Sequence, residues 1–127
     1  MLEEMVDTND EWITSRTGIK ERRILKDPNL GTSYLAIKAA EDLIQKKKLD
    51  PKEIDAVIVA TATPDMMVAS TAAYVASAIG ATEAFSFDLQ AACSGFLYGM
   101  SSAAAYIASG MYRKVLLIGA DKMSSII

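Results

Sequence analysis

The sequence predicts an α/β fold with a parallel-dominated sheet and helices on both of its faces. Two apolar runs, residues 56–61 and 114–119, contain no polar alternation, which is typical of strands buried on both faces. Segments with the apolar spacing of helices lie before and between these runs. Strands that alternate with helices indicate right-handed crossovers between parallel strands.

Composition limits the classes of function. The chain has 127 residues, the size of one domain, with 13 Lys plus Arg against 16 Asp plus Glu and a net charge of −3. Without an overall basic field or an apolar run long enough for a membrane span, we expect neither nucleic-acid binding nor membrane association. The single cysteine excludes an internal disulfide, and no signal-peptide pattern is present, so a reducing cytoplasm is the expected compartment. No metal site is expected.

The amino-terminal residues combine helical turns with a basic cluster. Residues 1–12 predict short helical turns, capped by Asp7 or Thr8, rather than a strand. After them comes the densest group of basic side chains, Arg16, Lys20, Arg22 and Arg23. Such a cluster suits either a solvated face or, beside Trp12, a ligand that carries phosphates and a flat ring.

The next elements are a helix, a strand and a second helix. Thr32 or Ser33 is the expected cap of an amphipathic helix that runs to about Lys48, and Asp50 with Pro51 starts one further turn. The first buried strand, 56–61, is followed by an apolar loop segment, residues 66–68, that we expect at an interface or in a pocket. Ser70 or Thr71 is then expected to cap a helix that ends at Gly80.

The only cysteine, Cys93, lies where a strand turns into a helix. Residues 84–89 predict the strand, and a helix is expected from Ser94 to about 109–110. The positive end of a helix stabilises a thiolate, and the small neighbours of Cys93 let a substrate approach its backbone amide, a candidate oxyanion donor. A lone cysteine is also commonly a small buried hydrophobe, and this alternative stays open here. The strand–turn–helix setting is analogous to the nucleophile elbow of hydrolases.

Histidine is absent from the chain. A cysteine nucleophile usually works with an imidazole, which these residues do not supply.

Five motifs in order carry a resemblance to a known family. They are Asn-Asp-Glu-Trp at 9–12, Arg-Thr-Gly-Ile with Glu-Arg at 16–22, Thr-Ala-Thr-Pro-Asp at 61–65, Asp-Leu-Gln-Ala-Ala-Cys-Ser-Gly-Phe at 88–96 and the strand 115–121. Together they resemble the 3-oxoacyl-[acyl-carrier-protein] synthase III family of thiolase-like condensing enzymes, over essentially the whole chain. The cysteine motif alone is less specific, since other condensing enzymes share its form.

The resemblance implies an activity in the initiation of fatty-acid synthesis. It implies a thiolase-like fold of two similar α/β halves, working as a homodimer, in which Cys93 accepts the acyl group of an acyl-CoA, often acetyl-CoA, as a thioester. Malonyl-acyl carrier protein then loses carbon dioxide and condenses with that group to give a 3-oxoacyl product. No cofactor is implied beyond these two substrates.

Four further residues take roles from the resemblance. Trp12 matches a residue that stacks on the adenine of CoA, Arg16 one that meets its charged portion, and Thr8 a nearby contact. Val68 falls at a position that enters the acyl pocket of the partner subunit, so residues 66–68 are expected to help set acyl length.

The chain also departs from the family. Members are about twice as long, more than one ordinary domain, and their second half carries a histidine and an asparagine that complete the catalytic set. We therefore expect residues 1–127 to be an incomplete, amino-terminal half of a thiolase-like domain, without the carboxyl-terminal half and inactive alone. The alternatives are another CoA-condensing enzyme, such as a hydroxymethylglutaryl-CoA or polyketide-type synthase, and a non-catalytic fragment or association module. The motifs at Trp12 and Arg16 favour the first hypothesis.

Overall fold

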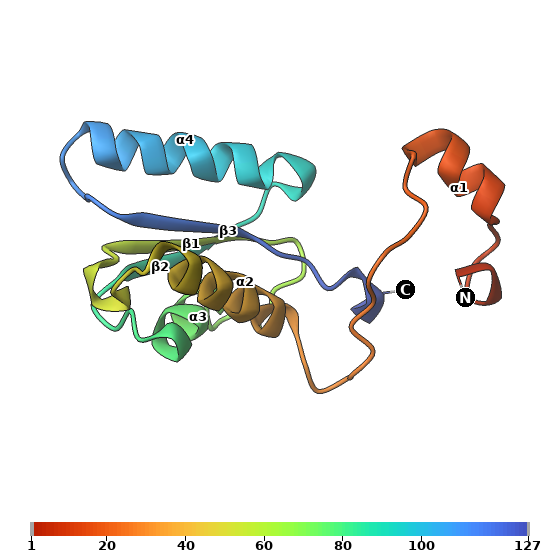
Figure 1. Cartoon of the computed structure of the whole chain (residues 1–127), viewed down its shortest axis with the longest axis horizontal. Coiled ribbons are helices and arrows are strands. Elements are labelled where there is room, and N and C mark those ends of the chain that lie inside the picture. Colours follow the sequence, from red (N-terminus) through yellow and green to blue (C-terminus); the bar gives the residue numbers. More distant parts are fainter. Residues whose placement is uncertain (1, 127) are drawn as a thin grey trace.

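A computed structural model describes residues 2–126, and it has three layers around a small sheet. The strands are β1 (Ala56–Ala60), β2 (Phe85–Leu89) and β3 (Val115–Gly119), all parallel, in the order β2-β1-β3. Helix α4 (Gly95–Ala108) covers one face, and α2 (Thr32–Lys47) and α3 (Thr71–Ile79) cover the other (Figure 1). The predicted α/β class, parallel sheet and two covered faces are confirmed.

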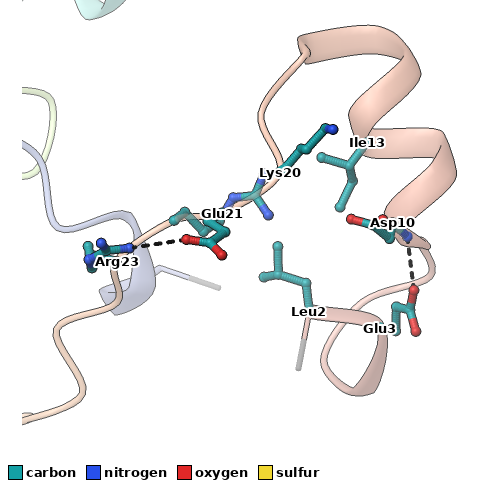
Figure 2. Close-up of a pocket in the computed structure, with 8 residues that line it drawn as sticks. Leu2, Glu3, Asp10, Ile13, Lys20, Glu21 and Arg23 are labelled. Carbon is teal, nitrogen blue, oxygen red and sulfur yellow. Dashed lines mark hydrogen bonds and ion pairs between the residues drawn. The ribbon is translucent and has the colours of Figure 1, made fainter.

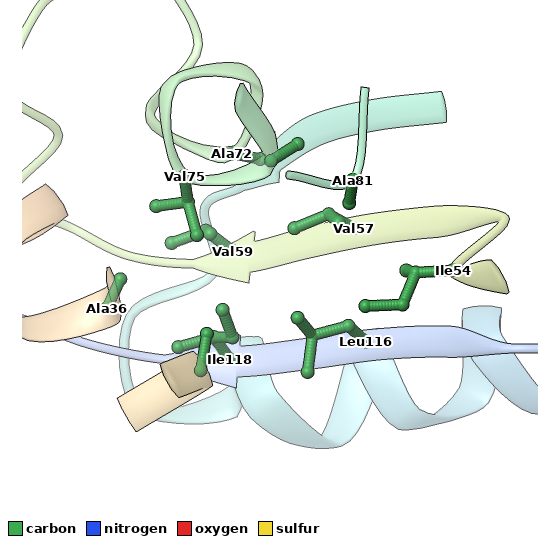
Figure 3. Close-up of a cluster of buried hydrophobic side chains, with 11 residues drawn as sticks. Ala36, Ile54, Val57, Val59, Ala72, Val75, Ala81, Leu116 and Ile118 are labelled. Carbon is green, nitrogen blue, oxygen red and sulfur yellow. The ribbon is translucent and has the colours of Figure 1, made fainter. Parts of the chain in front are cut away.

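The central strand β1 organises the core. All five of its residues are buried, as its unbroken apolar sequence predicts. Because strand side chains alternate between faces, Val57 and Val59 point together toward α2 and α3. There they pack with small residues of both helices and with Leu116 and Ile118 of β3 (Figure 3).

Strand β3 is less buried than predicted. Leu116 and Ile118 are buried, Val115 and Leu117 are half-buried, and Gly119 is exposed. On the α4 side, Leu117 packs against Gly99, where an added Cβ atom would lie 2.5 Å from Leu117 Cδ1. The prediction of burial on both faces is therefore wrong for β3 in this chain, because α4 alone covers an edge strand on that side.

The helix caps match the sequence in part. Ser70 Oγ accepts a hydrogen bond from the Ala73 amide at 3.2 Å, and Gly80 ends α3 with a φ of 86°, as predicted. For α2 the predicted cap is wrong. Gly31 is the N-cap, and the Ser33 amide instead donates to Asp65 Oδ1 at 3.0 Å. The capping oxygen comes from a loop 32 positions later, which local patterns do not reveal.

Single turns of 3-10 helix connect or end these elements. They are η1 (Leu2–Glu4), η2 (Pro51–Glu53), η3 (Ala92–Ser94) and η4 (Met123–Ser125). As predicted, Asp50 starts η2, since its Oδ1 accepts from the Lys52 amide at 3.0 Å.

The amino-terminal helix α1 (Asp10–Thr17) stands apart from the three layers (Figure 1). The expectation of helical turns here is confirmed, but the cap is Asn9, whose Oδ1 accepts from the Trp12 amide at 2.8 Å, rather than Asp7 or Thr8. Residues 18–31, called the arm below, connect α1 to α2. Among residues 2–126 no helix is long and apolar enough to cross a membrane.

Candidate active site

Cys93 lies in η3, the single turn that joins the end of β2 to the start of α4. The predicted position between strand and helix is confirmed. The thiol is exposed, so the alternative of a buried hydrophobic cysteine is wrong for this chain. Gly95 begins α4 next to the sheet, where a Cβ atom would touch the Ala60 Cβ atom at 3.4 Å.

The backbone before Cys93 has an uncommon conformation. Ala92 has a φ of 45°, in the left-handed region that residues with a Cβ atom rarely adopt. The Ser94 amide donates to the Ala91 carbonyl at 3.0 Å and closes the turn. Strain of this kind persists where the surrounding structure enforces it, commonly at functional sites, so this turn holds Cys93 in a defined place.

A shallow pocket of about 240 Å³ contains Cys93. It is formed by the carboxyl ends of β1 and β3 and the start of α4, and its lining residues are Ala60, Ala92, Cys93, Phe96, Gly119, Ala120 and Asp121. The carboxyl edge of a parallel sheet is where α/β proteins bind ligands. Except for Cys93, none of these residues was a predicted site residue, although the ends of predicted parallel strands could have indicated them.

Asp121 joins the two loops that border this pocket. Its Oδ1 atom accepts hydrogen bonds from the Ala62 and Thr63 amides at 2.7 and 3.2 Å. It also accepts from the hydroxyl groups of Thr61 and Thr63, at 3.0 and 3.2 Å. The loop after β1 is therefore fastened to the loop after β3 beside the thiol.

Asp88 of the cysteine motif has a structural role in this chain. Its Oδ2 atom accepts from the Thr71 amide at 2.8 Å, and its Oδ1 atom from the Ala72 amide at 2.7 Å and the Ser70 hydroxyl at 3.1 Å. A carboxylate at a helix amino terminus satisfies free amides and complements the dipole. Asp88 thus fixes α3 to β2 from within the motif that contains Cys93.

The predicted CoA contacts lie on and beside α1. The Arg16 Cζ atom is 4.3 Å from the centroid of the Trp12 ring, a cation–π geometry, and Trp12 is 52% exposed. The hydroxyl oxygen of Thr8 is buried and has no hydrogen-bond partner within the described part of the chain. Trp12 and Arg16 therefore form a pair of a flat ring and a cation that is open to solvent.

The rest of the basic cluster faces acidic side chains. Lys20, Arg22 and Arg23 line a pocket of about 420 Å³ between α1, η1 and the arm, together with Glu3, Asp10 and Glu21 (Figure 2). Arg23 Nη1 lies 3.9 Å from Glu21 Oε2, and both side chains are almost fully exposed. The cluster is thus split: Arg16 pairs with Trp12, and the other three belong to a surface of mixed charge.

The structure does not bring all predicted site residues into one pocket. Thr8, Trp12 and Arg16 are absent from the lining of the Cys93 pocket, as is Val68, which is 98% exposed. Met66 lines a separate apolar pocket of about 350 Å³ between α2 and α3, which also contains Tyr34 and Tyr74. Of residues 66–68, Met66 therefore lies in a pocket as expected, while the alternative of an interface for the exposed Met67 and Val68 stays a prediction.

Comparisons with known proteins find that the chain is similar to type III ketoacyl synthases. The family model described as 3-oxoacyl-[acyl-carrier-protein (ACP)] synthase III matches residues 87–127, which include Cys93. Beta-ketoacyl-[acyl-carrier-protein] synthase III of Phocaeicola vulgatus is 58% identical over 126 residues, 99% of this chain and 38% of that protein.

Solved structures give the same result. The crystal structure of 3-oxoacyl-[acyl-carrier-protein] synthase III from Aquifex aeolicus matches with a TM-score of 0.89 and 47% identity, over 98% of this chain and 40% of that one. The enzyme from Thermus thermophilus matches with a TM-score of 0.88 and 46% identity, over 98% and 38%. The chain thus spans about 38% of the length of the curated relatives it matches. In sequence and in fold, it corresponds to the amino-terminal portion of a beta-ketoacyl-[acyl-carrier-protein] synthase III, a thiolase-like condensing enzyme.

Proposed function

We propose that Cys93 is the nucleophile of an initiating condensing enzyme and accepts the acyl group of an acyl-CoA, with acetyl-CoA as the expected donor. The observation that carries this proposal is the position of an exposed thiol in a pocket at the carboxyl edge of the sheet. The relatives' printed names, which describe ketoacyl synthases that act with acyl carrier protein, support the same chemistry.

In the first step the Cys93 thiolate attacks the thioester carbonyl carbon of acyl-CoA. The bond between that carbon and the CoA sulfur breaks, and CoA leaves as a thiolate that takes a proton from solvent. One thioester replaces another, so the exchange is nearly neutral in energy and the acyl carbonyl stays electrophilic. The Cys93 amide, in the turn directly before α4, is the proposed donor to the transient oxyanion. The thiol has to be reduced for this step, which suits a reducing compartment such as the cytoplasm.

The proposed binding site for CoA is Thr8, Trp12 and Arg16. An exposed indole with a guanidinium over one face offers a stacking surface for adenine and a positive charge for phosphate. Val68 is proposed as a contact for the acyl chain in a homodimer, since its side chain is almost fully exposed in the single chain.

The second step is proposed for the complete enzyme only. Malonyl-acyl carrier protein would lose carbon dioxide, its enolate carbon would form a bond with the acyl carbonyl carbon, and the Cys93 thiolate would be released. No histidine is present in these 127 residues, so an imidazole for the decarboxylation has to come from outside them. We accordingly expect this chain alone to be inactive in condensation.

The exposed face of α4 supports the hypothesis that further protein packs on this helix. Leu97, Tyr98, Met100 and Ile107 of this helix are each more than half exposed. An apolar helix face of this kind is typical of a surface covered by further protein. We propose that residues 1–127 are an incomplete amino-terminal half of a thiolase-like domain whose other half packs on α4.

Incubation with acetyl-CoA, followed by mass spectrometry of the peptide that contains Cys93, tests the proposal. The protein that carries this chain is expected to gain one acetyl group on Cys93, and its Cys93→Ala variant none. Absence of the acetyl group from the wild-type peptide would rule the nucleophile role out.

A further inference from the structure

Lys122 is a buried lysine whose ammonium group donates hydrogen bonds to main-chain carbonyl oxygens. This residue lies three positions after the end of β3 and is only 8% exposed. The ammonium nitrogen donates to the carbonyl oxygens of Asp27 and Leu30, at 2.7 and 2.6 Å. A buried ammonium group is costly unless its protons are bonded, so these contacts restrict the geometry of both segments.

The segment that Lys122 holds is the arm, residues 18–31. A second contact lies one turn further along, where Ser124 Oγ donates to the Leu25 carbonyl at 3.2 Å. Figure 1 shows η4 beside the arm and α1 at the far end of the arm, away from the three layers. The position of the arm therefore decides where α1, with Trp12 and Arg16, lies relative to the sheet.

The backbone of Lys122 is hydrogen-bonded close to a residue that lines the Cys93 pocket. Its amide lies 2.9 Å from Thr63 Oγ1 and 3.2 Å from Thr32 Oγ1. The preceding residue, Asp121, lines the pocket and holds the loop at Thr63. Two successive residues thus face two parts of the candidate site: Asp121 supports the wall beside Cys93, and Lys122 supports the arm.

We propose that Lys122 is a positioning residue that sets the distance and orientation between α1 and the Cys93 pocket. This inference rests on the proposed function, because it takes CoA as the ligand of Trp12 and Arg16. When Lys122 holds the arm, these two residues bind CoA with its thioester directed at the Cys93 thiol. Without the ammonium group, α1 samples many positions, and CoA binding becomes weaker while the thiol itself is unchanged.

The variant Lys122→Met keeps the length of the side chain and removes its donors. Trp12 is the only tryptophan among these 127 residues, so its time-resolved fluorescence anisotropy, measured on the 127-residue chain, reports the motion of α1 directly. We expect a fast anisotropy decay in Lys122→Met that is absent from the wild type. The control is Lys47→Met, which changes an exposed lysine at the end of α2 and should leave the decay unchanged.

A second readout separates binding from chemistry. In Lys122→Met, the acetyl-CoA concentration for half-maximal acylation of Cys93 should rise about tenfold, since two charge-assisted hydrogen bonds that hold the arm are lost. The maximal acylation rate and the rate of Cys93 alkylation by iodoacetamide should stay within about twofold of the wild type. The proposal would be overturned if a folded Lys122→Met protein showed the same anisotropy decay as the wild type. It would also be overturned if the maximal acylation rate fell while the acetyl-CoA concentration for half-maximal acylation stayed unchanged.

The two hypotheses can fail separately. If acetyl-CoA does not acylate the wild type, the proposed function fails, and the anisotropy comparison still decides whether Lys122 holds α1. If Lys122→Met does not fold by circular dichroism, Ser124→Ala removes the second contact alone and should give a weaker fast decay. A rigid Trp12 in Ser124→Ala would then count against the role of this junction.

Discussion

Gly119 at the end of β3 lies against the ring of Phe96, within the pocket that contains Cys93: a Cβ atom at Gly119 would be 3.2 Å from Phe96 Cδ2. That separation is shorter than ordinary van der Waals contact, so any side chain at position 119 has to displace the ring. The size of the pocket beside the thiol thus depends on a glycine at the end of β3 and on an aromatic ring of α4.

Substitution Gly119→Ala should restrict access to Cys93. The added methyl group pushes the Phe96 ring toward the pocket, and we expect alkylation by N-ethylmaleimide to slow roughly fivefold, which corresponds to about 1 kcal/mol of added steric cost. Alkylation by the smaller iodoacetamide should change less. The ratio of the two rates, measured by mass spectrometry, is the readout.

A compensating variant makes that test specific. Gly119→Ala with Phe96→Leu removes the ring that the methyl group meets, and the ratio of rates should return toward that of the wild type. If the single substitution slows both reagents equally, the effect is not one of pocket size.

Asp88 is expected to contribute to stability through α3. Replacement by Ala leaves the Thr71 and Ala72 amides without their acceptor, which should lower the free energy of unfolding by about 1–3 kcal/mol in urea titrations. Asp88→Asn keeps one acceptor oxygen, so its free energy of unfolding should lie between those of the wild type and Asp88→Ala. The control is Asp42→Ala, which removes an exposed ion pair to Lys46 and should change the free energy of unfolding by less than about 0.5 kcal/mol. Equal losses for Asp88→Ala and Asp42→Ala would contradict the capping role.

Local patterns account for much of the fold. The burial of β1 follows from five consecutive apolar residues, and the turn at Cys93 follows from a strand pattern that meets a helical one. Each of these features depends on neighbours within a few positions. The position of the thiol at the junction of a strand and a helix is therefore predictable from the sequence alone.

Features that depend on distant pairs were not predicted. Asp65 replaces the expected cap of α2 because the loop after β1 comes back to that helix. Asp121 and Lys122 become part of the site only because β1 and β3 are adjacent and the arm passes beside η4. The order of strands in the sheet decides these contacts, and no local pattern encodes that order.

Asp55 should make stability depend on pH in the acid range. The Lys114 and Arg113 amides donate to its Oδ2 atom at 2.9 and 2.7 Å, and these hydrogen bonds hold the pKa of the carboxyl group below its ordinary value of 3.8. A lowered pKa in the folded state means that the unfolded chain binds the proton more readily. The contribution of Asp55 is therefore complete above the ordinary pKa and is lost as pH falls through the lower, folded value.

The variant Asp55→Asn isolates this contribution. It cannot ionise, so the stability difference between wild type and variant should be largest at pH 5–7 and should shrink steadily as pH is lowered through and below about 3.8. Urea unfolding at a series of pH values measures the difference, and a repeat at higher salt separates the short hydrogen bonds from general charge effects, because salt screens the latter more. A difference that stays constant between pH 7 and pH 3 would show that the carboxylate form of Asp55 is not what the two amides stabilise.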